Sequence, residues 1–493
     1  MKRFAALFAA IVMIAAPAIA RPSEHVTVAQ GTPPGSLELV GHDALMNRGM
    51  NAALAVTDGY AYVGSRTDGL HPNSGVMIVD VHDPSKPSVV GQITQTPTGA
   101  NDGETSRELR IWPQQHLLIV LYLASNCSPE IHECSPTQAT KSDTYRFYDI
   151  SGDNAAAPKL VAEYVPTHSP HEFFLWSDPK NPKRALMYQS EPGSGTQLSV
   201  IDISGARDKK FKEIATYKAL VPTAGDNRIH SMSISPDGKT GYIAALQGGF
   251  WEIDTSQVAA GKPKPKITEI TPILNRAHWD GPGDHSSVPV PGSPYVLTTD
   301  EVYGKIPVLL SNHGCPWGWV RLLDLKDPTH PKVVSEYKLP ENDPSYCSDT
   351  VGDNPVRNSL SSWSAHNPTL TNDLAFVTWH SGGLQAIDIS DPTHVKQAAA
   401  YTPTPEPAVV TEDPALSSGE DKVVMWSYPI VVDGLIYVVD IRNGFYVLRY
   451  AGPHQGRILG SEFEEGNSNI GFIGRFRKRP LGRDDEPRRE AGR

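Results

Sequence analysis

The stretch GVMIVDVHDPSKPSVVG, residues Gly75 to Gly91, holds the pattern that decides the fold of this chain. An alternating apolar run, MIVDV, is followed by a turn at Asp83-Pro84 and by a second short apolar run. Alternation of apolar and polar side chains is typical of a β-strand, and Asp-Pro favours a turn. The stretch therefore predicts two strands joined by a tight connection.

The same pattern returns along the chain. Six further copies are YRFYDIS (145–151), LSVIDIS (198–204), GGFWEIDTS (248–256), GWVRLLDLKDPTHPKVV (318–334), GGLQAIDISDP (382–392) and GFYVLRY (444–450). The last copy is degenerate, because Arg449 stands where the others have Asp. A single small sheet cannot bury both of its faces, so repeated units of this kind must stack around an axis. The repeats predict an all-β fold, a seven-bladed β-propeller.

The end of the repeats indicates how the ring closes. After GFYVLRY the strand pattern stops, so the seventh blade lacks an outer strand. SLELVG (36–41) is a lone strand before the first full blade, and we expect it to fill this place, which removes a sheet edge. The predicted propeller spans residues 36–450, between a flexible leader (21–35) and a tail (451–493) whose composition favours disorder.

The repeated strands MIVDV, VIDIS and AIDIS resemble those of the LVIVD-repeat family over about residues 36–450. The resemblance implies the propeller fold. It does not name an activity, because propellers host many functions.

The N-terminus, MKRFAALFAAIVMIAAPAIA (1–20), has the three parts of a signal peptide. Lys2 and Arg3 precede an apolar run, and Ala18-Ile19-Ala20 is a cleavage signature. We expect export to the periplasm or the extracellular space, with no membrane span after cleavage. The net charge of −11 argues against a nucleic-acid binder, and we expect a monomer.

Four cysteines in an exported chain suggest two disulfides, for which three pairings are possible. Cys127 and Cys134 share one predicted loop and are expected to pair, which leaves Cys315 with Cys347. Free thiols or a soft-metal site are the alternatives.

Histidine recurs at one position of the repeat. Seven residues before the hairpin turn, blades three to six carry His171, His230, His285 and His366. The same count gives Asn51 in blade one, Arg107 or Glu108 in blade two, and Trp426 in blade seven. Side chains alternate between the faces of a strand, so residues in equal register point the same way. Because inner strands line the channel of a propeller, we expect the four histidines to converge at one mouth.

Several imidazoles without cysteine suit Cu, Zn, Fe or Ni better than Ca or Mg. The four histidines are therefore predicted metal ligands, with copper or zinc favoured. Glu301 and His380 end second strands and are expected near the same mouth, as a ligand, a general base or a partner of a ligand. The alternative is structural, with each histidine fixing the seam to the next blade.

An exported propeller with inward histidines also resembles, more distantly, the selenium-binding protein and methanethiol oxidase family. The resemblance rests on architecture and on HSMSISPDGKTGYIA, and it implies copper bound through histidine. The sequence thus supports two functions. One is a metal-dependent oxidoreductase acting on a small substrate. The other is a non-catalytic scaffold that binds a protein or glycan through its loop-rich face.

Overall fold

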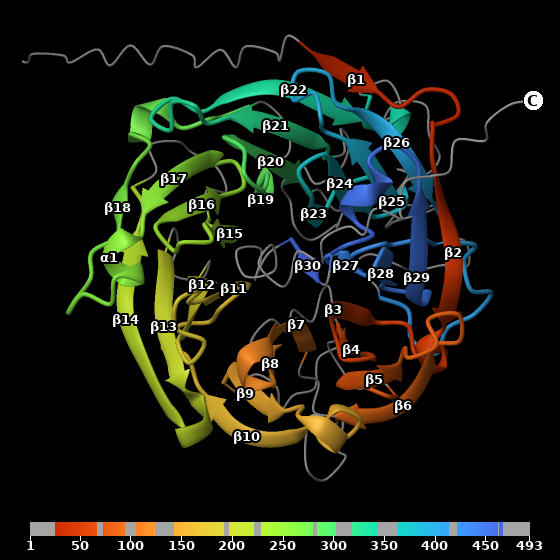
Figure 1. Cartoon of the computed structure of the whole chain (residues 1–493), viewed down its shortest axis with the longest axis horizontal. Helices are drawn as coiled ribbons and strands as arrows, with labels where there is room; N and C mark the ends of the chain where they lie inside the picture. Colours follow the sequence, from red (N-terminus) through yellow and green to blue (C-terminus); the bar gives the residue numbers. More distant parts are fainter. Residues whose placement is uncertain are drawn as a thin grey trace, which may run out of the picture.

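Seven sheets stand around a central axis in the computed structural model of this chain, which confirms the predicted seven-bladed β-propeller (Figure 1). The described residues are 25–66, 72–93, 105–123, 142–191, 197–220, 228–279, 283–301, 318–343, 362–413, 422–461 and 463–466. The expected signal peptide and all four cysteines, hence both expected disulfides, lie outside these residues. No helix in the described ranges has the length and hydrophobicity needed to cross a membrane.

Each blade is an antiparallel sheet whose first strand lines the axis. From the axis outward, blades one to four are β3 (Asn51–Thr57), β4 (Tyr60–Ser65), β5 (Val76–Asp80), β6 (Ser88–Ile93); β7 (Thr105–Trp112), β8 (Leu117–Leu123), β9 (Thr144–Asp149), β10 (Lys159–Tyr164); β11 (Phe173–Ser177), β12 (Ala185–Glu191), β13 (Gln197–Gly205), β14 (Lys210–Lys218); and β15 (Ser231–Ile234), β16 (Thr240–Ala244), β17 (Phe250–Asp254), β18 (Thr268–Glu269). Blades five to seven are β19 (Asp284–Pro289), β20 (Tyr295–Asp300), β21 (Val320–Asp324), β22 (Lys332–Lys338); β23 (Pro368–Leu370), β24 (Leu374–Trp379), β25 (Gly383–Asp388), β26 (Lys396–Tyr401); and β27 (Ile430–Val432), β28 (Leu435–Asp440), β29 (Gly444–Ala451), β2 (Ser36–Asp43). A short α-helix, α1 (Ser256–Ala259), follows β17.

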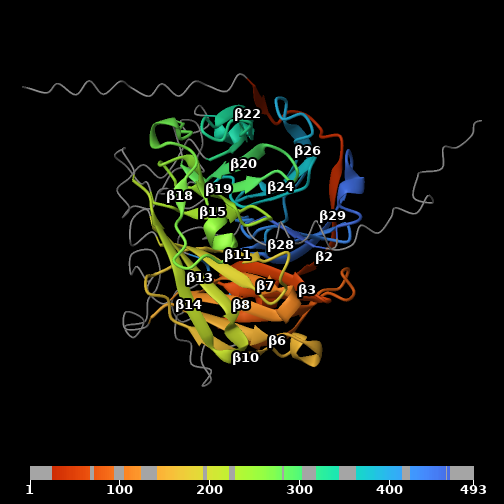
Figure 2. The same ribbon diagram turned by 60° about the vertical axis from the view of Figure 1, so that its left-hand side comes forward.

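The ring closes as the sequence predicts. Strand β2 pairs antiparallel with β29, from Ser36 opposite Ala451 to Asp43 opposite Phe445, and the two strands lie side by side in Figure 2. Gly41 also meets blade one, where an added Cβ would lie 2.2 Å from the carbonyl oxygen of Pro84. Blade seven is therefore built from both ends of the propeller sequence.

Two short strands lie in the segments that the sequence analysis treated as a flexible leader and a disordered tail. Strand β1 (Val26–Val28) runs parallel to β22 on the outer edge of blade five. Strand β30 (Glu464–Glu465) pairs with β27 on the channel side of blade seven. Strands of two and three residues are too short for a periodicity to show, so the sequence pattern gives no sign of them.

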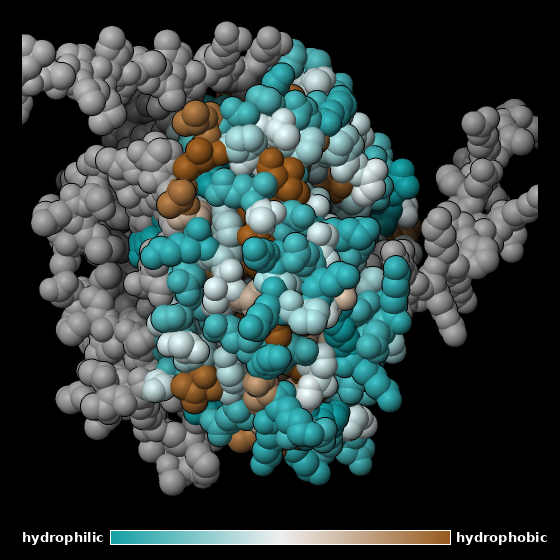
Figure 3. Space-filling view, turned by 90° about the vertical axis from the view of Figure 1, so that its left-hand side faces the viewer, coloured by the Kyte–Doolittle hydropathy of each residue, from teal (hydrophilic) through white to brown (hydrophobic). Residues whose placement is uncertain are grey.

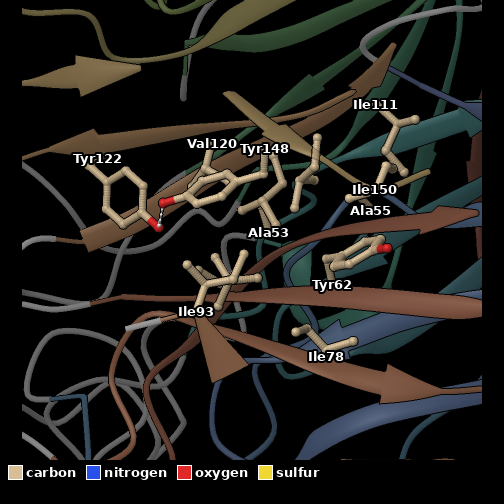
Figure 4. Close-up of a cluster of buried hydrophobic side chains, with 14 of the residues drawn as sticks. Ala53, Ala55, Tyr62, Ile78, Ile93, Ile111, Val120, Tyr122, Tyr148 and Ile150 are labelled. Atoms are coloured by element: carbon tan, nitrogen blue, oxygen red, sulfur yellow. Dashed lines mark hydrogen bonds between the residues drawn. The ribbon is translucent and has the colours of Figure 1, made fainter. Parts of the chain in front are cut away.

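The hydrophobic core lies between neighbouring blades rather than on the axis. Figure 4 shows one such cluster, in which Tyr62 and Ile78 of blade one meet Ile111 and Val120 of blade two. The hydroxyl groups of Tyr122 and Tyr148 lie 3.2 Å apart at its edge. The outer wall seen in Figure 3 is mostly hydrophilic, with hydrophobic residues scattered over it. Because the apolar side chains pack between blades, the axis is left to polar ones.

Candidate metal site at the channel mouth

The four histidines predicted from the repeat lie side by side at one end of the inner strands. The backbone N–H groups of His171, His230 and His366 donate to second-strand carbonyls in their own blades, which sets the three residues at equal height. The ring centroids of successive residues from His171 through His230 and His285 to His366 are 4.3, 3.9 and 4.4 Å apart. The structure therefore brings all four rings together.

Two positions of this ring are β-bulges. The pairing register shifts between Asp284 and Ser286, around His285, and between Ser106 and Glu108, around Arg107. A bulge re-aims a side chain and is common beside functional sites. Of the two blade-two candidates, Arg107 joins the ring, because its Nη2 lies 3.1 Å from His171 Nε2.

Glu301 occupies the centre of the site. One carboxylate oxygen lies 3.1 Å from His285 Nε2, and the other lies 3.2 Å from His366 Nε2. The second oxygen is also 3.2 Å from Nε2 of His380. Glu301 directly follows β20, and His380 directly follows β24. The side chains of all four residues are at most 7% exposed.

The possible ligand atoms fall into two overlapping groups. Within each group they lie within 4.8 Å of one another, and the groups are His230, His285, Glu301 and Glu301, His366, His380. His171 belongs to neither group, and its Nε2 lies 2.7 Å from Nε2 of His230. The site is thus centred on a carboxylate with histidines around it, whereas the sequence suggested four equivalent histidines.

Hydrogen bonds on the far side of the rings fix how the histidines present their nitrogens. His366 Nδ1 lies 2.6 Å from the carbonyl oxygen of Trp426, so this nitrogen must carry the proton. His285 Nδ1 lies 2.8 Å from Oγ of Ser286, which also contacts Oδ1 of Asn367 and the hydroxyl group of Tyr428. In the neutral ring of His366, Nε2 therefore bears the lone pair.

Burial and charge keep these groups in the protonation states that bind metals. Burial lowers the pKa of His366 well below its ordinary value, although Glu301 opposes this shift. Burial would raise the pKa of Glu301, but His366 and His285 lower it more, so it lies well below its usual range. The carboxylate of Glu301 is therefore ionised, which suits it to bind a cation.

Nε2 of His285 and Nε2 of His366 face the two carboxylate oxygens of Glu301 at 3.1 and 3.2 Å. His285 Nε2 and Glu301 Oε1 are buried and make no hydrogen bond to any described residue. A cation among these atoms could be bound by ring nitrogens and carboxylate oxygens together. Ligand atoms about 2.0–2.2 Å from a tetrahedral metal are about 3.3–3.5 Å apart, close to these distances. The donor set therefore fits a transition metal ion.

A second buried network lies deeper in the channel, and sequence reasoning missed it. Arg110 contacts three carboxylates, with nitrogen–oxygen distances of 3.2 Å to Glu108, 3.7 Å to Glu172 and 3.3 Å to Glu465. The Tyr428 hydroxyl donates to Glu172 at 3.0 Å. Burial, followed by the charge of Glu108, raises the pKa of Glu172 well above its usual value. Glu465 comes from the tail, so no repeat pattern could place it here.

Comparison with protein families supports the repeat. The family model of the LVIVD repeat matches residues 48–95 and 365–402, in blades one and six. No curated protein matches the chain. Similar solved structures include a hypothetical selenium-binding protein from Sulfolobus tokodaii, with 13% identity, a TM-score of 0.41, and coverage of 59% of this chain and 66% of that one. The alignment thus spans just under two thirds of that protein.

Two further similar structures cover most of this chain. Sqt1 from Chaetomium thermophilum has 13% identity and a TM-score of 0.45, with coverage of 86% of this chain and 87% of that one. The β-propeller domain of Myceliophteria thermophila Cps50 (Swd1) has 10% identity and a TM-score of 0.45, with coverage of 84% and 98%. The chain is thus a seven-bladed β-propeller that carries LVIVD repeats.

Proposed function

We propose that this protein is an exported propeller that binds a transition metal ion, copper or zinc, at the mouth of its channel. With this ion bound, the protein would act as an oxidoreductase on a small substrate. Glu301, His285, His366 and His380 would hold the ion, with His230 beside them. The observation that carries the proposal is the buried cluster in which Nε2 of His285, His366 and His380 lies 3.1, 3.2 and 3.2 Å from the carboxylate of Glu301.

The protein's own groups have distinct roles in this proposal. Glu301 supplies the negative charge that a cation requires, and its low pKa keeps that charge in place. Trp426 and Ser286 hold two imidazoles in the orientation that offers Nε2. Burial of the ligands excludes water from most of the site and strengthens its electrostatic interactions. Copper would supply one-electron chemistry, whereas zinc would act as a Lewis acid.

Metal analysis of purified mature protein tests the proposal. We expect one equivalent of copper or zinc per chain after reconstitution and dialysis. Glu301→Gln and His366→Ala should lose at least about 100-fold in affinity, because even the hydrogen-bond partners of ligands are worth about 10–100-fold. Glu163→Gln and His394→Ala are matched controls, since the side chains of Glu163 and His394 are 49% and 65% exposed.

The outcome separates the two functions that the sequence supports. A folded wild-type protein that retains no transition metal would contradict the proposal and return the protein to the class of binding scaffolds. The same conclusion follows if both site variants retain metal as tightly as their controls. N-terminal sequencing of the exported protein should begin at Arg21, which tests cleavage after Ala20.

A further inference from the structure

At the channel mouth, the four histidines have Arg107 on one side and Trp426 on the other. We propose that Arg107 binds the carboxylate group of a small monoanionic ligand beside the metal site. The assignment of this ligand as the substrate rests on the proposed function. The binding of the anion itself does not, because Arg107 is outside the group of metal ligands.

Contacts place Arg107 next to the site. Its guanidinium carbon lies 5.7 Å from the centroid of the Trp426 ring, and its Nη2 lies 3.1 Å from His171 Nε2. The Trp426 ring in turn stacks on the imidazole of His366 at 4.8 Å. The order around the channel is therefore Arg107, His171, His230, His285, His366 and Trp426, with Asn51 of blade one at the repeat position between Trp426 and Arg107.

The positive charge of Arg107 is only weakly compensated. Its side chain is 11% exposed, and its Nε lies 4.0 Å from an oxygen of Glu108. That carboxylate lies closer to Arg110, at 3.2 Å. The Nε–H of Arg107 is buried and makes no hydrogen bond within the described part of the chain. A guanidinium has five donors, and a buried donor without an acceptor is costly.

The partner of Arg107 on the ring is a neutral base rather than an acid. Burial, followed by the charge of Arg107, lowers the pKa of His171 well below its ordinary value. Arg107 donates to Nε2 of this neutral ring, so the lone pair that a metal would need is already used. In this proposal His171 orients Arg107 through Nε2, and its role as a metal ligand stays a prediction from the sequence.

A neighbouring arginine shows why Arg107 is the anion site. Arg66 lies at nearly the same distance from Trp426, 5.6 Å, but its Nε contacts the buried carboxylate of Asp413 at 2.5 Å. Arg66 thus has a close carboxylate partner, whereas the carboxylate that faces Arg107, Glu108, is 4.0 Å away. The planar fork of a guanidinium matches a carboxylate in charge and in shape. A β-bulge positions Arg107 in the ring, and a second β-bulge positions His285 in the same way.

Calorimetric titration with acetate, and with neutral acetamide as its isostere, tests the inference on the full-length mature protein. We expect metal-free wild type to bind acetate and to show no heat with acetamide. Arg107→Gln should lose at least about tenfold in acetate affinity. Arg107→Lys should lose less, because it keeps the charge but not the fork. Arg207→Gln is the matched control, since Arg207 is 43% exposed and pairs with Asp149.

Three results would overturn the inference. The first is equal binding of acetate and acetamide, and the second is unchanged acetate affinity in Arg107→Gln. The third is acetate binding that requires bound metal and has the same affinity in Arg107→Gln and Arg107→Lys. If Arg107→Gln does not fold, unchanged acetate affinity in Arg107→Lys has the same meaning. Acetate binding through Arg107 in a protein that takes up no metal would defeat the proposed function and leave the anion site standing.

Discussion

Removal of the closing strand should abolish both the fold and the site, whereas removal of the leader should not. The two variants are mature proteins that begin after Pro34 and after Gly41. The longer deletion removes five of the seven residue pairs that join β2 to β29, those from Ser36 to Gly41. It also removes Leu37, which is 6% exposed in the core between blades six and seven.

The magnitude follows from these contacts. An antiparallel ladder has about one backbone hydrogen bond per residue pair, and each contributes about 1 kcal/mol net, so five pairs contribute about 5 kcal/mol. Burial of Leu37 adds about 2 kcal/mol. The sum, about 7 kcal/mol, is within the range of a whole domain's free energy of unfolding, about 5–15 kcal/mol. The shorter deletion removes only β1, a three-residue pairing on the outer edge of blade five.

Urea unfolding followed by far-ultraviolet circular dichroism compares the two truncations with the mature protein. We expect a near-native midpoint for the shorter deletion and a chain largely unfolded without urea for the longer one. The shorter deletion should keep metal binding and the longer one should lose it, because blade seven carries the Trp426 carbonyl group that orients His366. Equal midpoints for the two truncations would refute the assigned role of β2.

Two further predictions concern single side chains. Ser286→Ala removes the hydroxyl group that contacts His285 Nδ1 and should weaken metal binding by about 10–100-fold. Equilibrium dialysis measures this against Ser390→Ala, whose serine is exposed in a turn, and equal affinities of the two variants would contradict the role of Ser286. Burial raises the pKa of Glu252 to about 7. The folded state therefore binds this proton more tightly than the unfolded state. Ionisation of Glu252 should lower the free energy of unfolding by up to about 3 kcal/mol as the pH rises from about 4.5 through 7. Urea unfolding at pH 5.5 and 8 should show a smaller loss of stability for Glu252→Gln than for wild type, and an identical loss in both would count against it.

The repeat made the fold and the histidine ring predictable. A fixed count of seven residues from the hairpin turn sets height along the axis, and strand alternation sets direction. The central place of Glu301 was not accessible in the same way. The sequence put Glu301 and His380 at the ends of second strands, but their contacts with His285 and His366 depend on side-chain reach between blades.

Two other features depend on geometry that a repeat count does not contain. Bulges decide that Arg107 and not Glu108 joins the ring, and that His285 reaches the site although its strand begins one residue earlier. Glu465 enters the channel on β30, whose two residues carry no periodicity. Local irregularity and contacts from outside the repeat thus account for what the pattern missed.

The asymmetry of the ring follows from the same architecture. Each blade offers one residue at the start of its inner strand, so the repeat alone would place seven similar positions around the axis. Blades five and six also contribute a residue from the end of the second strand, Glu301 and His380, and there the site becomes a cluster of ligands. Blades two and seven offer Arg107 and Trp426 instead. One repeat position thus provides two adjacent chemistries, a place for a cation and a place for an anion, and a small ligand held between them would contact both.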